Sequence, residues 1–282
     1  MELGVGSYAF RWAVGHPAFR PRVPLTVAGM VDEAGALGCG LLQIADNAEL
    51  DSMDPDRLRA LRDHADARGV RLQVGTSGLT EARLRRQLTV AAELGADIVR
   101  VVLDADGVHP SPAECVAILR AVAPDYEAAG VTVAIENHFL TPSDQLVSIV
   151  EGSGSRAVGV CLDTANSIMI GEWPAETIAL LAPHCVNLHF KDYAVVSDQH
   201  GVGGHVVGRT LGEGWLDIPG LLTAVVAADQ RLDGRLGVIV EQWLPLQGDE
   251  TATLDAERAG REANIDAARR ILRQNDPARM TP

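Results

Sequence analysis

Four residues that can bind a metal ion or move a proton follow short apolar runs in the second half of the chain. They are Glu136, Asp163, His189 and Glu241. Each lies at or near the end of a run typical of a buried β-strand. Three carboxylates and one imidazole converging at neighbouring strand ends would repel one another unless a cation lay among them. These four residues therefore predict a site for one divalent metal ion.

The chemistry of the ligands indicates which metals would suit this site. Carboxylate oxygens with a single nitrogen favour Mn²⁺, Mg²⁺ or Co²⁺ over a structural Zn²⁺. We expect Mn²⁺ first, with Mg²⁺, Co²⁺ or Zn²⁺ as alternatives. Each residue alone has a structural explanation, because Asp163 precedes Thr164 and could cap a helix, and His189 could be a core histidine. The joint pattern on four consecutive strands favours the metal site.

Lys191 is the only lysine in the chain, and the other basic residues are arginines. It lies two residues after His189, so the two side chains share one face of the strand. A lysine there could protonate an enolate, bind a substrate carboxylate or form a Schiff base. The alternative is a surface lysine paired with Asp192. We predict that Lys191 is catalytic.

Further candidates for substrate contact flank these strand ends. His138 lies two residues after Glu136, so its side chain should point to the same face of the strand. Arg209 lies in a long loop where it could bind an anionic group. The aromatic residues after the first strand could form a wall of the pocket. These are Tyr8, Phe10 and Trp12.

The elements that must position these residues alternate along the chain. Eight apolar runs predict strands, each followed by a stretch with helical periodicity. They are Leu3–Gly6, Leu41–Ala45, Arg71–Val74, Ile98–Val102, Val131–Glu136, Val158–Asp163, Val186–Phe190 and Val238–Glu241. Eight β/α units in 282 residues predict an α/β fold, a single-domain (β/α)8 TIM barrel over residues 1–282. A doubly wound sheet is disfavoured because no helix opens after Gly4-Val5-Gly6-Ser7.

One connection is unusually long for a compact barrel. The segment at about 193–215 is rich in Gly and His and should lie at the C-terminal face, where active sites form. We expect it to be a lid-like loop. A mobile surface excursion is the alternative.

Composition excludes several classes of protein. The net charge of -14 disfavours a nucleic-acid partner, since phosphate contacts need an excess of basic residues. No apolar run is long enough for a membrane span, and no signal peptide is visible. The four cysteines have no CxxC spacing, which indicates a reducing, cytoplasmic location.

Four segments together resemble the xylose isomerase-like TIM-barrel superfamily of sugar phosphate isomerases and epimerases. They are Ile135-Glu136-Asn137-His138, Cys161-Leu162-Asp163-Thr164, Leu188-His189-Phe190-Lys191-Asp192 and Leu211-Gly212-Glu213-Gly214-Trp215-Leu216-Asp217-Ile218. The resemblance implies that the four ligands named above bind one metal. It also implies that Glu136 and Glu241 move protons on opposite faces of a substrate through an enediolate.

Two departures from the pattern leave the reaction open. Free-ketose epimerases usually carry a His where Asn166 stands, a position we expect to contact substrate. The stretch from His189 to Asp192 looks more like inosose dehydratase and other lyase-type members. The leading hypothesis is an isomerase or epimerase of a small polyhydroxylated carbonyl compound. The alternative is a lyase, either a dehydratase of an inosose-like keto-polyol or a decarboxylase of a 3-oxo sugar acid.

Two other classes of protein are disfavoured alternatives. A repair nuclease of the endonuclease IV type would need more His ligands and a basic face, which the charge opposes. A non-catalytic binding barrel would make the ligand pattern a coincidence. Barrels of this kind often pair, so a homodimer is also an expectation.

Overall fold

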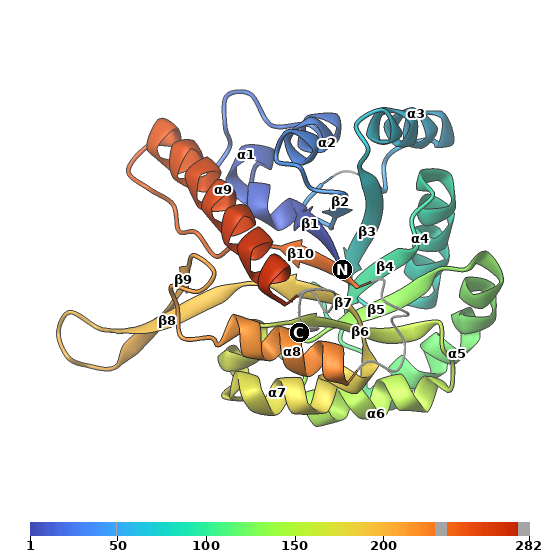
Figure 1. Ribbon diagram of the computed structural model, residues 1–282. Coiled ribbons are helices and arrows are strands. Elements are labelled where there is room, and N and C mark those ends of the chain that lie inside the picture. The colour runs from blue at the N-terminus through green and yellow to red at the C-terminus, as the bar shows by residue number, and fades with distance from the viewer. Residues whose placement is uncertain (49, 229–235, 276–282) are drawn as a thin grey trace, which may run out of the picture.

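Eight parallel strands close into a barrel in the computed structural model, which describes residues 1–48, 50–228 and 236–275 (Figure 1). In chain order the strands are β1 (Glu2–Gly6), β2 (Leu41–Ile44), β3 (Arg71–Ser77), β4 (Ile98–Val102), β5 (Thr132–Glu136), β6 (Val158–Asp163), β7 (Cys185–Phe190) and β10 (Gly237–Val240). Around the barrel they follow the order β1-β10-β7-β6-β5-β4-β3-β2. The predicted single-domain TIM barrel is confirmed, and each predicted strand lies within three residues of an observed one at either end.

Helices form the outer layer of the barrel (Figure 1). They are α1 (Arg11–Val14), α2 (Val27–Ala36), α3 (Pro55–Asp66), α4 (Glu81–Leu94), α5 (Pro112–Ala129), α6 (Ser143–Ser153), α7 (Pro174–Leu181), α8 (Ile218–Ala227) and α9 (Glu250–Gln274). The short 3₁₀ helices are η1 (Ser7–Phe10), η2 (Asn166–Ile170) and η3 (Ala182–His184). The boundaries follow local chemistry, since Ser111 and Glu114 form a capping box at the start of α5 and left-handed Gly130 ends it. None of the helices in the described residues combines the length and apolarity needed to cross a membrane.

The two faces of the strands differ in character. Outward-facing residues such as Val133, Ile135 and Leu188 are buried apolar side chains of the main core, which lies between the strands and the helices. Inward-facing residues become polar toward the C-terminal end of the barrel, where Glu136 and His189 are buried. Because side chains alternate along a strand, this arrangement places the chemistry inside the barrel and the apolar packing outside it.

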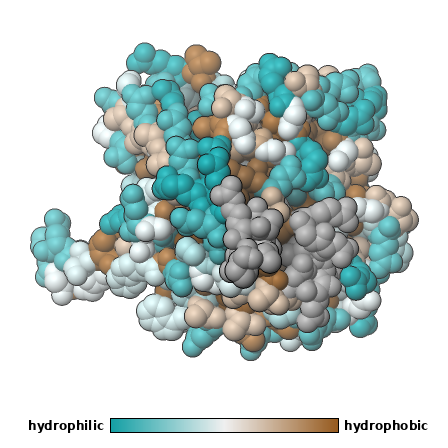
Figure 2. Space-filling view, in the orientation of Figure 1, coloured by the Kyte–Doolittle hydropathy of each residue, from teal (hydrophilic) through white to brown (hydrophobic). Residues whose placement is uncertain are grey.

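The segment predicted as a long loop instead contains a β-hairpin. Strands β8 (Asp192–Ser197) and β9 (Gly204–Arg209) pair antiparallel and form a separate two-stranded sheet. Figures 1 and 2 show the hairpin projecting from the body of the barrel with a hydrophilic tip. The glycine-rich part lies at the turn, where Gly201 and Gly203 have positive φ, while the flanking valines supply the strands.

Candidate active site

His189 lies at the centre of the predicted ligand set. Its Nδ1 atom is 3.5 Å from Glu136 Oε2, 3.7 Å from Asp163 Oδ2 and 3.7 Å from Glu241 Oε1. All four residues are buried, and they come from the C-terminal ends of β5, β6, β7 and β10. The structure therefore brings the four predicted metal ligands together around one imidazole nitrogen.

Asp163 uses its two carboxylate oxygens differently. Oδ1 accepts backbone N–H groups from Ala165 and Asn166, each at 2.9 Å, and so caps the turn that leads into η2. Oδ2 faces His189 and makes no hydrogen bond, although Lys191 Nζ lies 2.7 Å away. Oδ1 therefore makes the contacts expected of a cap, and Oδ2 is the oxygen placed where a metal ligand is predicted.

Glu241 follows the last residue of β10, and its side chain lies beside Gly6 of the neighbouring strand β1. A Cβ atom at Gly6 would lie 2.8 Å from Glu241 Oε1, closer than such contacts occur. The second glycine of Gly4-Val5-Gly6 therefore leaves room for this carboxylate. Gly6, which could have belonged to a phosphate-binding loop, instead leaves room for an acidic side chain.

Arg100 is a functional candidate that sequence reasoning missed. It points into the barrel from β4, is 3% exposed, and makes a short ion pair with Glu136 through Nε. Its NH1 atom lies 3.6 Å from Asp46 Oδ1. The available signal was a charged residue inside the apolar run Ile98–Val102, which a buried strand carries only when the charge is paired.

Lys191 joins the carboxylates directly. Its Nζ atom lies 2.7 Å from Asp163 Oδ2, 2.9 Å from Glu241 Oε2 and 3.4 Å from Asn166 Oδ1. The surface pairing with Asp192 that was the alternative does not occur, because Asp192 instead accepts N–H groups from Gly212 and Gly214. Lys191 is thus a buried cation of the site.

Burial and charge act in opposite directions on these groups. Burial alone would lower the pKa of Lys191, but Asp163, Glu241 and Glu136 outweigh it and raise that pKa above its ordinary value. Burial would raise the pKa of Asp163, but Lys191 and His189 hold it below its usual range. The pKa of Glu241 is lowered in the same way, against its burial, chiefly by Lys191. The buried charges are therefore mutually compensated.

A cavity of about 290 Å³ opens over this cluster. Its lining includes Glu136, Glu241 and Lys191 on the floor and the aromatic residues Phe139 and Trp243 on the walls. Lys191 Nζ lies 5.6 Å from the centre of the Trp243 ring, within the range of a cation–π interaction. The volume suits a small metabolite rather than a polymer.

The predicted substrate-contact residues divide into two groups. Tyr8, His138 and Asn166 line this cavity, and Asn166 Nδ2 donates to Glu136 Oε1 at 2.8 Å. Trp12 lines an adjoining apolar cavity that shares Trp243 with the first, and its indole N–H donates to Leu244 O at 2.9 Å.

Two other predicted substrate contacts, Phe10 and Arg209, do not line either of these cavities. Phe10 is fully buried, with the Arg261 guanidinium of α9 4.2 Å from its ring centre, because the 3₁₀ turn of η1 carries it away from the cavity. Arg209 ends β9 as an exposed side chain that donates to the neighbouring Gly208 carbonyl. Arg209 lies at the base of the hairpin opposite Asp192, and its side chain is exposed.

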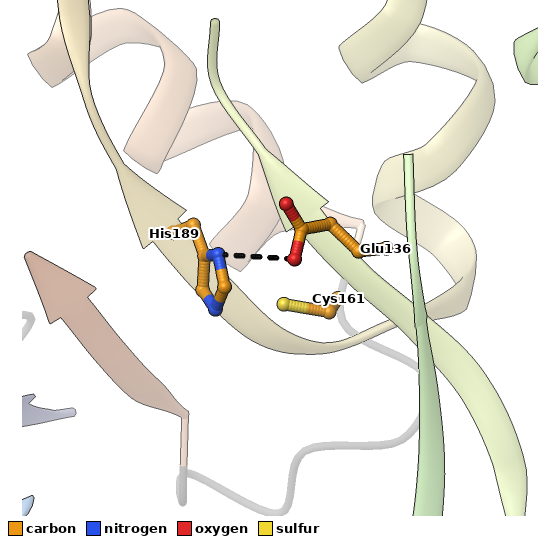
Figure 3. Close-up of side chains that lie close together, drawn as sticks. All are labelled: Glu136, Cys161 and His189. Carbon is orange, nitrogen blue, oxygen red and sulfur yellow. Dashed lines mark ion pairs between the residues drawn. The ribbon is translucent and has the colours of Figure 1, made fainter. Parts of the chain in front are cut away.

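The residues present fit a divalent cation. His189 Nδ1 and Asp163 Oδ2 are buried polar atoms without a hydrogen bond in the described part of the chain. Asp163, His189 and Glu241 offer ligand atoms within 4.8 Å of one another, and Glu136, Cys161 and His189 form a second such group. Figure 3 shows Cys161 beside the imidazole, with Nδ1 turned toward the Glu136 carboxylate. His189 Nδ1 faces three carboxylates without a hydrogen bond, and Asp163 Oδ2 has the Lys191 ammonium beside it, so a bound cation would satisfy Nδ1 and share the carboxylates with Lys191.

Comparison with known proteins assigns the family. The family described as xylose isomerase-like TIM barrel matches residues 31–274. The chain belongs to this family.

Relatives agree with this assignment and differ in activity. The chain is 32% identical over 259 residues to the 3-oxo-isoapionate decarboxylase of Pectobacterium atrosepticum, covering 92% of each protein. Its fold is similar to that of a D-psicose 3-epimerase with D-tagatose from Clostridium cellulolyticum H10, with a TM-score of 0.68, 16% identity and 96% and 99% of the two chains covered. A xylose isomerase-like TIM barrel protein from Mycobacterium smegmatis in complex with magnesium is similar, with a TM-score of 0.64, 15% identity and 94% and 97% covered. These relatives share the fold, and the described part of this chain has a buried group of residues able to bind a metal.

Proposed function

We propose that this protein is a metal-dependent decarboxylase of a small polyhydroxylated 3-oxo carboxylic acid. The observation that carries the proposal is the place of Lys191, whose ammonium contacts Asp163 and Glu241 at the floor of the cavity. A decarboxylase must deliver a proton to the carbon that loses CO₂, and a buried ammonium is a suitable donor. The 32% identical relative named as a 3-oxo-isoapionate decarboxylase supports the same reaction class.

The environment of the two glutamates favours this reaction over proton abstraction by a glutamate pair. Glu136 is occupied by Arg100 on one oxygen and by Asn166 on the other. Glu241 is paired with Lys191 at 2.9 Å. An epimerase base needs a free carboxylate lone pair aimed at a C–H bond, whereas here a cation lies against one oxygen of each carboxylate and Asn166 occupies the other oxygen of Glu136.

The proposed step balances as follows. The bond between the substrate's α-carbon and its carboxylate carbon breaks, and the carboxylate leaves as CO₂. The electron pair of that bond forms the enolate of the 3-oxo group. Lys191 then transfers a proton from Nζ to the α-carbon, which regenerates the ketone, and water from the cavity reprotonates the amine. No oxidant or reductant is required.

Arg11 is a suitable anchor for the substrate's carboxylate. It lines both adjoining cavities and makes no ion pair with a carboxylate within the described residues. Its NH2 atom instead lies 3.3 Å from His16 Nε2, and its guanidinium lies 5.5 Å from the Tyr8 ring centre. A guanidinium without an acidic partner at the cavity rim is free to bind a substrate anion.

The metal would supply the remaining charge stabilisation. A divalent cation held by Glu136, Asp163, His189 and Glu241 would provide a positive charge beside the oxygen on which negative charge develops. Mn²⁺ is our first choice, with Mg²⁺ and Co²⁺ next, because the donor set is rich in oxygen.

The test uses 3-oxo-isoapionate and related 3-oxo sugar acids, with release of CO₂ as the measurement. We expect turnover in the presence of Mn²⁺ and, in D₂O, one deuterium at the carbon that loses CO₂. Lys191→Met should reduce kcat by about 10²–10⁴-fold while Mn²⁺ still binds. Arg209→Ala, at an exposed position outside the cavity, is the matched control and should behave as wild type.

Two results would count against the proposal. Absence of CO₂ release from every 3-oxo acid tested would reject the reaction class. Near-normal turnover by Lys191→Met would reject the role of the lysine and leave solvent as the proton source.

Isomerisation or epimerisation of a small sugar is the second candidate. It is favoured by the two buried glutamates on β5 and just after β10, each within 3.7 Å of His189 Nδ1. This reaction would exchange substrate hydrogen for deuterium next to the carbonyl of a ketose without releasing CO₂. A panel of free ketoses incubated in D₂O distinguishes the two candidates.

A further inference from the structure

Three buried amides fill the barrel interior beneath His189. They are Gln43 on β2, Gln73 on β3 and Asn187 on β7, and none is more than 3% exposed. Gln43 Nε2 donates to Gln73 Oε1 at 3.1 Å and to Asn187 Oδ1 at 3.0 Å, and Asn187 Nδ2 donates to Gln73 Oε1 at 3.1 Å. TIM-barrel interiors are usually filled by branched apolar side chains, so a polar layer at this depth calls for an explanation.

The hydrogen bonds within the amide layer determine which atom of Gln43 faces the imidazole. Because the Gln43 amino group faces two acceptors, its carbonyl oxygen Oε1 is the atom presented to His189 Nε2, at 2.7 Å. In this orientation Nε2 carries the proton and donates it to Gln43. A neutral imidazole with its proton on Nε2 has a lone pair on Nδ1, the atom that faces the three carboxylates.

The lone pair on Nδ1 has no donor within the described residues. A lone pair on Nδ1 among carboxylate oxygens is repulsive unless a proton or a metal cation lies between them, and a bound metal would take the place of that proton. Metal-binding histidines generally donate their other ring N–H to a fixed acceptor, which sets the tautomer and the ring orientation.

We propose that Gln43 is a positioning residue that holds His189 in the tautomer able to bind the metal. The inference deepens the proposed metal site and rests on it, but it holds for either candidate reaction. The acceptors Gln73 and Asn187 fix the orientation of the Gln43 amide. The Gln43 carbonyl oxygen in turn accepts the Nε2 proton and so fixes the tautomer of His189.

The test compares two isosteric variants by their affinity for Mn²⁺, measured by titration calorimetry without substrate. Gln43→Met removes the acceptor of the His189 proton and should weaken Mn²⁺ binding about 10- to 100-fold. Gln73→Met is the matched control, since it breaks the same amide layer but leaves Asn187 Oδ1 as an acceptor for the Gln43 amino group, which is enough to keep Gln43 Oε1 beside His189. It should cost similar stability to unfolding while changing Mn²⁺ affinity by less than about 3-fold.

Equal loss of affinity in the two variants would make Gln43 a packing residue and overturn the inference. A wild-type protein that binds no Mn²⁺ would overturn the metal site as well. Normal Mn²⁺ binding without CO₂ release would reject only the proposed reaction, so the failures are distinguishable.

Nitrogen NMR on the wild-type protein gives a measurement that needs no variant to fold. In protein labelled with ¹⁵N-histidine and loaded with Mg²⁺, the His189 proton should reside on Nε2. Residence of the proton on Nδ1 would mean that the amide layer runs in the reverse direction, and would overturn the proposal.

Discussion

Single side chains in this site perform two tasks at once, and Asp163 shows it most clearly. One oxygen caps the backbone turn after β6 and the other faces the imidazole. A cap needs only an acceptor, which an amide also supplies, whereas a cation needs negative charge. The two tasks can therefore be separated by substitution.

Asp163→Asn should keep the cap and lose the metal. We expect Mn²⁺ affinity to fall by at least 10-fold, because an amide removes the charge at Oδ2. Asp163→Ala should lose the cap as well and be less stable to urea than Asp163→Asn by about 1 kcal/mol. Calorimetric titration and urea unfolding measure the two effects. Wild-type Mn²⁺ affinity in Asp163→Asn would show that this carboxylate is structural only.

At the residue scale, the sequence pointed to the four predicted metal ligands more readily than to the groups that contact them. Glu136 and His189 could be found because they end apolar strands, a feature visible without any knowledge of the fold. Arg100 and Gln43 lie inside strands, where their importance depends on which face points inward and on partners from other strands. That information comes from the register of the closed barrel and is not local.

At the scale of elements, the passage from β7 to the hairpin is stabilised by one buried carboxylate. Asp192 starts β8 and accepts backbone N–H groups from Gly212, Gly214 and Leu216 at 2.9–3.2 Å. Burial raises the pKa of Asp192 even though these donors oppose that shift. The carboxylate thereby ties the chain that leaves the barrel to the chain that returns to it.

Asp192→Ala should leave these backbone donors without their acceptor. Each hydrogen bond to a charged group contributes about 1.5–3 kcal/mol, but the glycine donors at the loop surface regain water as a partner, so we expect a net loss of about 2–4 kcal/mol in the free energy of unfolding. Urea denaturation measures it. Glu213→Ala removes an exposed carboxylate from the same loop and should change stability by less than about 0.5 kcal/mol. An equally small effect in Asp192→Ala would show that the loop is held by other contacts.

The two strands of the hairpin could not be predicted from the local sequence pattern. Alternating strands and helices predict a barrel because each unit repeats the same short-range signals. The segment at about 193–215 carries glycine and histidine without such periodicity, and its strands pair only with each other. Its suggested action as a lid stays a prediction.

At the scale of the whole molecule, buried charge is balanced across four strands. The metal site would couple cation binding to the stability of the entire barrel, since its ligands come from β5, β6 and β7 and from the residue after β10. Any ligand that binds only the folded state stabilises it by mass action.

Chelation should therefore lower the melting temperature. Mn²⁺ at 100 times its Kd would add about 2.7 kcal/mol of stability, equivalent to several degrees in Tm for a chain of this size. Calorimetric or fluorescence melting with Mn²⁺ and with EDTA measures the difference. His189→Ala should abolish it, whereas Arg209→Ala should retain it. A metal-induced rise in Tm that persists in His189→Ala would place the binding site elsewhere.

The lone lysine has a practical consequence. Because Lys191 is 6% exposed and lies at the floor of the cavity, the folded surface carries its positive charge almost entirely as guanidinium groups. The chain's only side-chain amine then lies inside the cavity, where Asp163 and Glu241 hold it as an ammonium. Its acylation would require both an open cavity and loss of that pairing, so one amine-directed reagent could report on the state of the cavity without any engineered label.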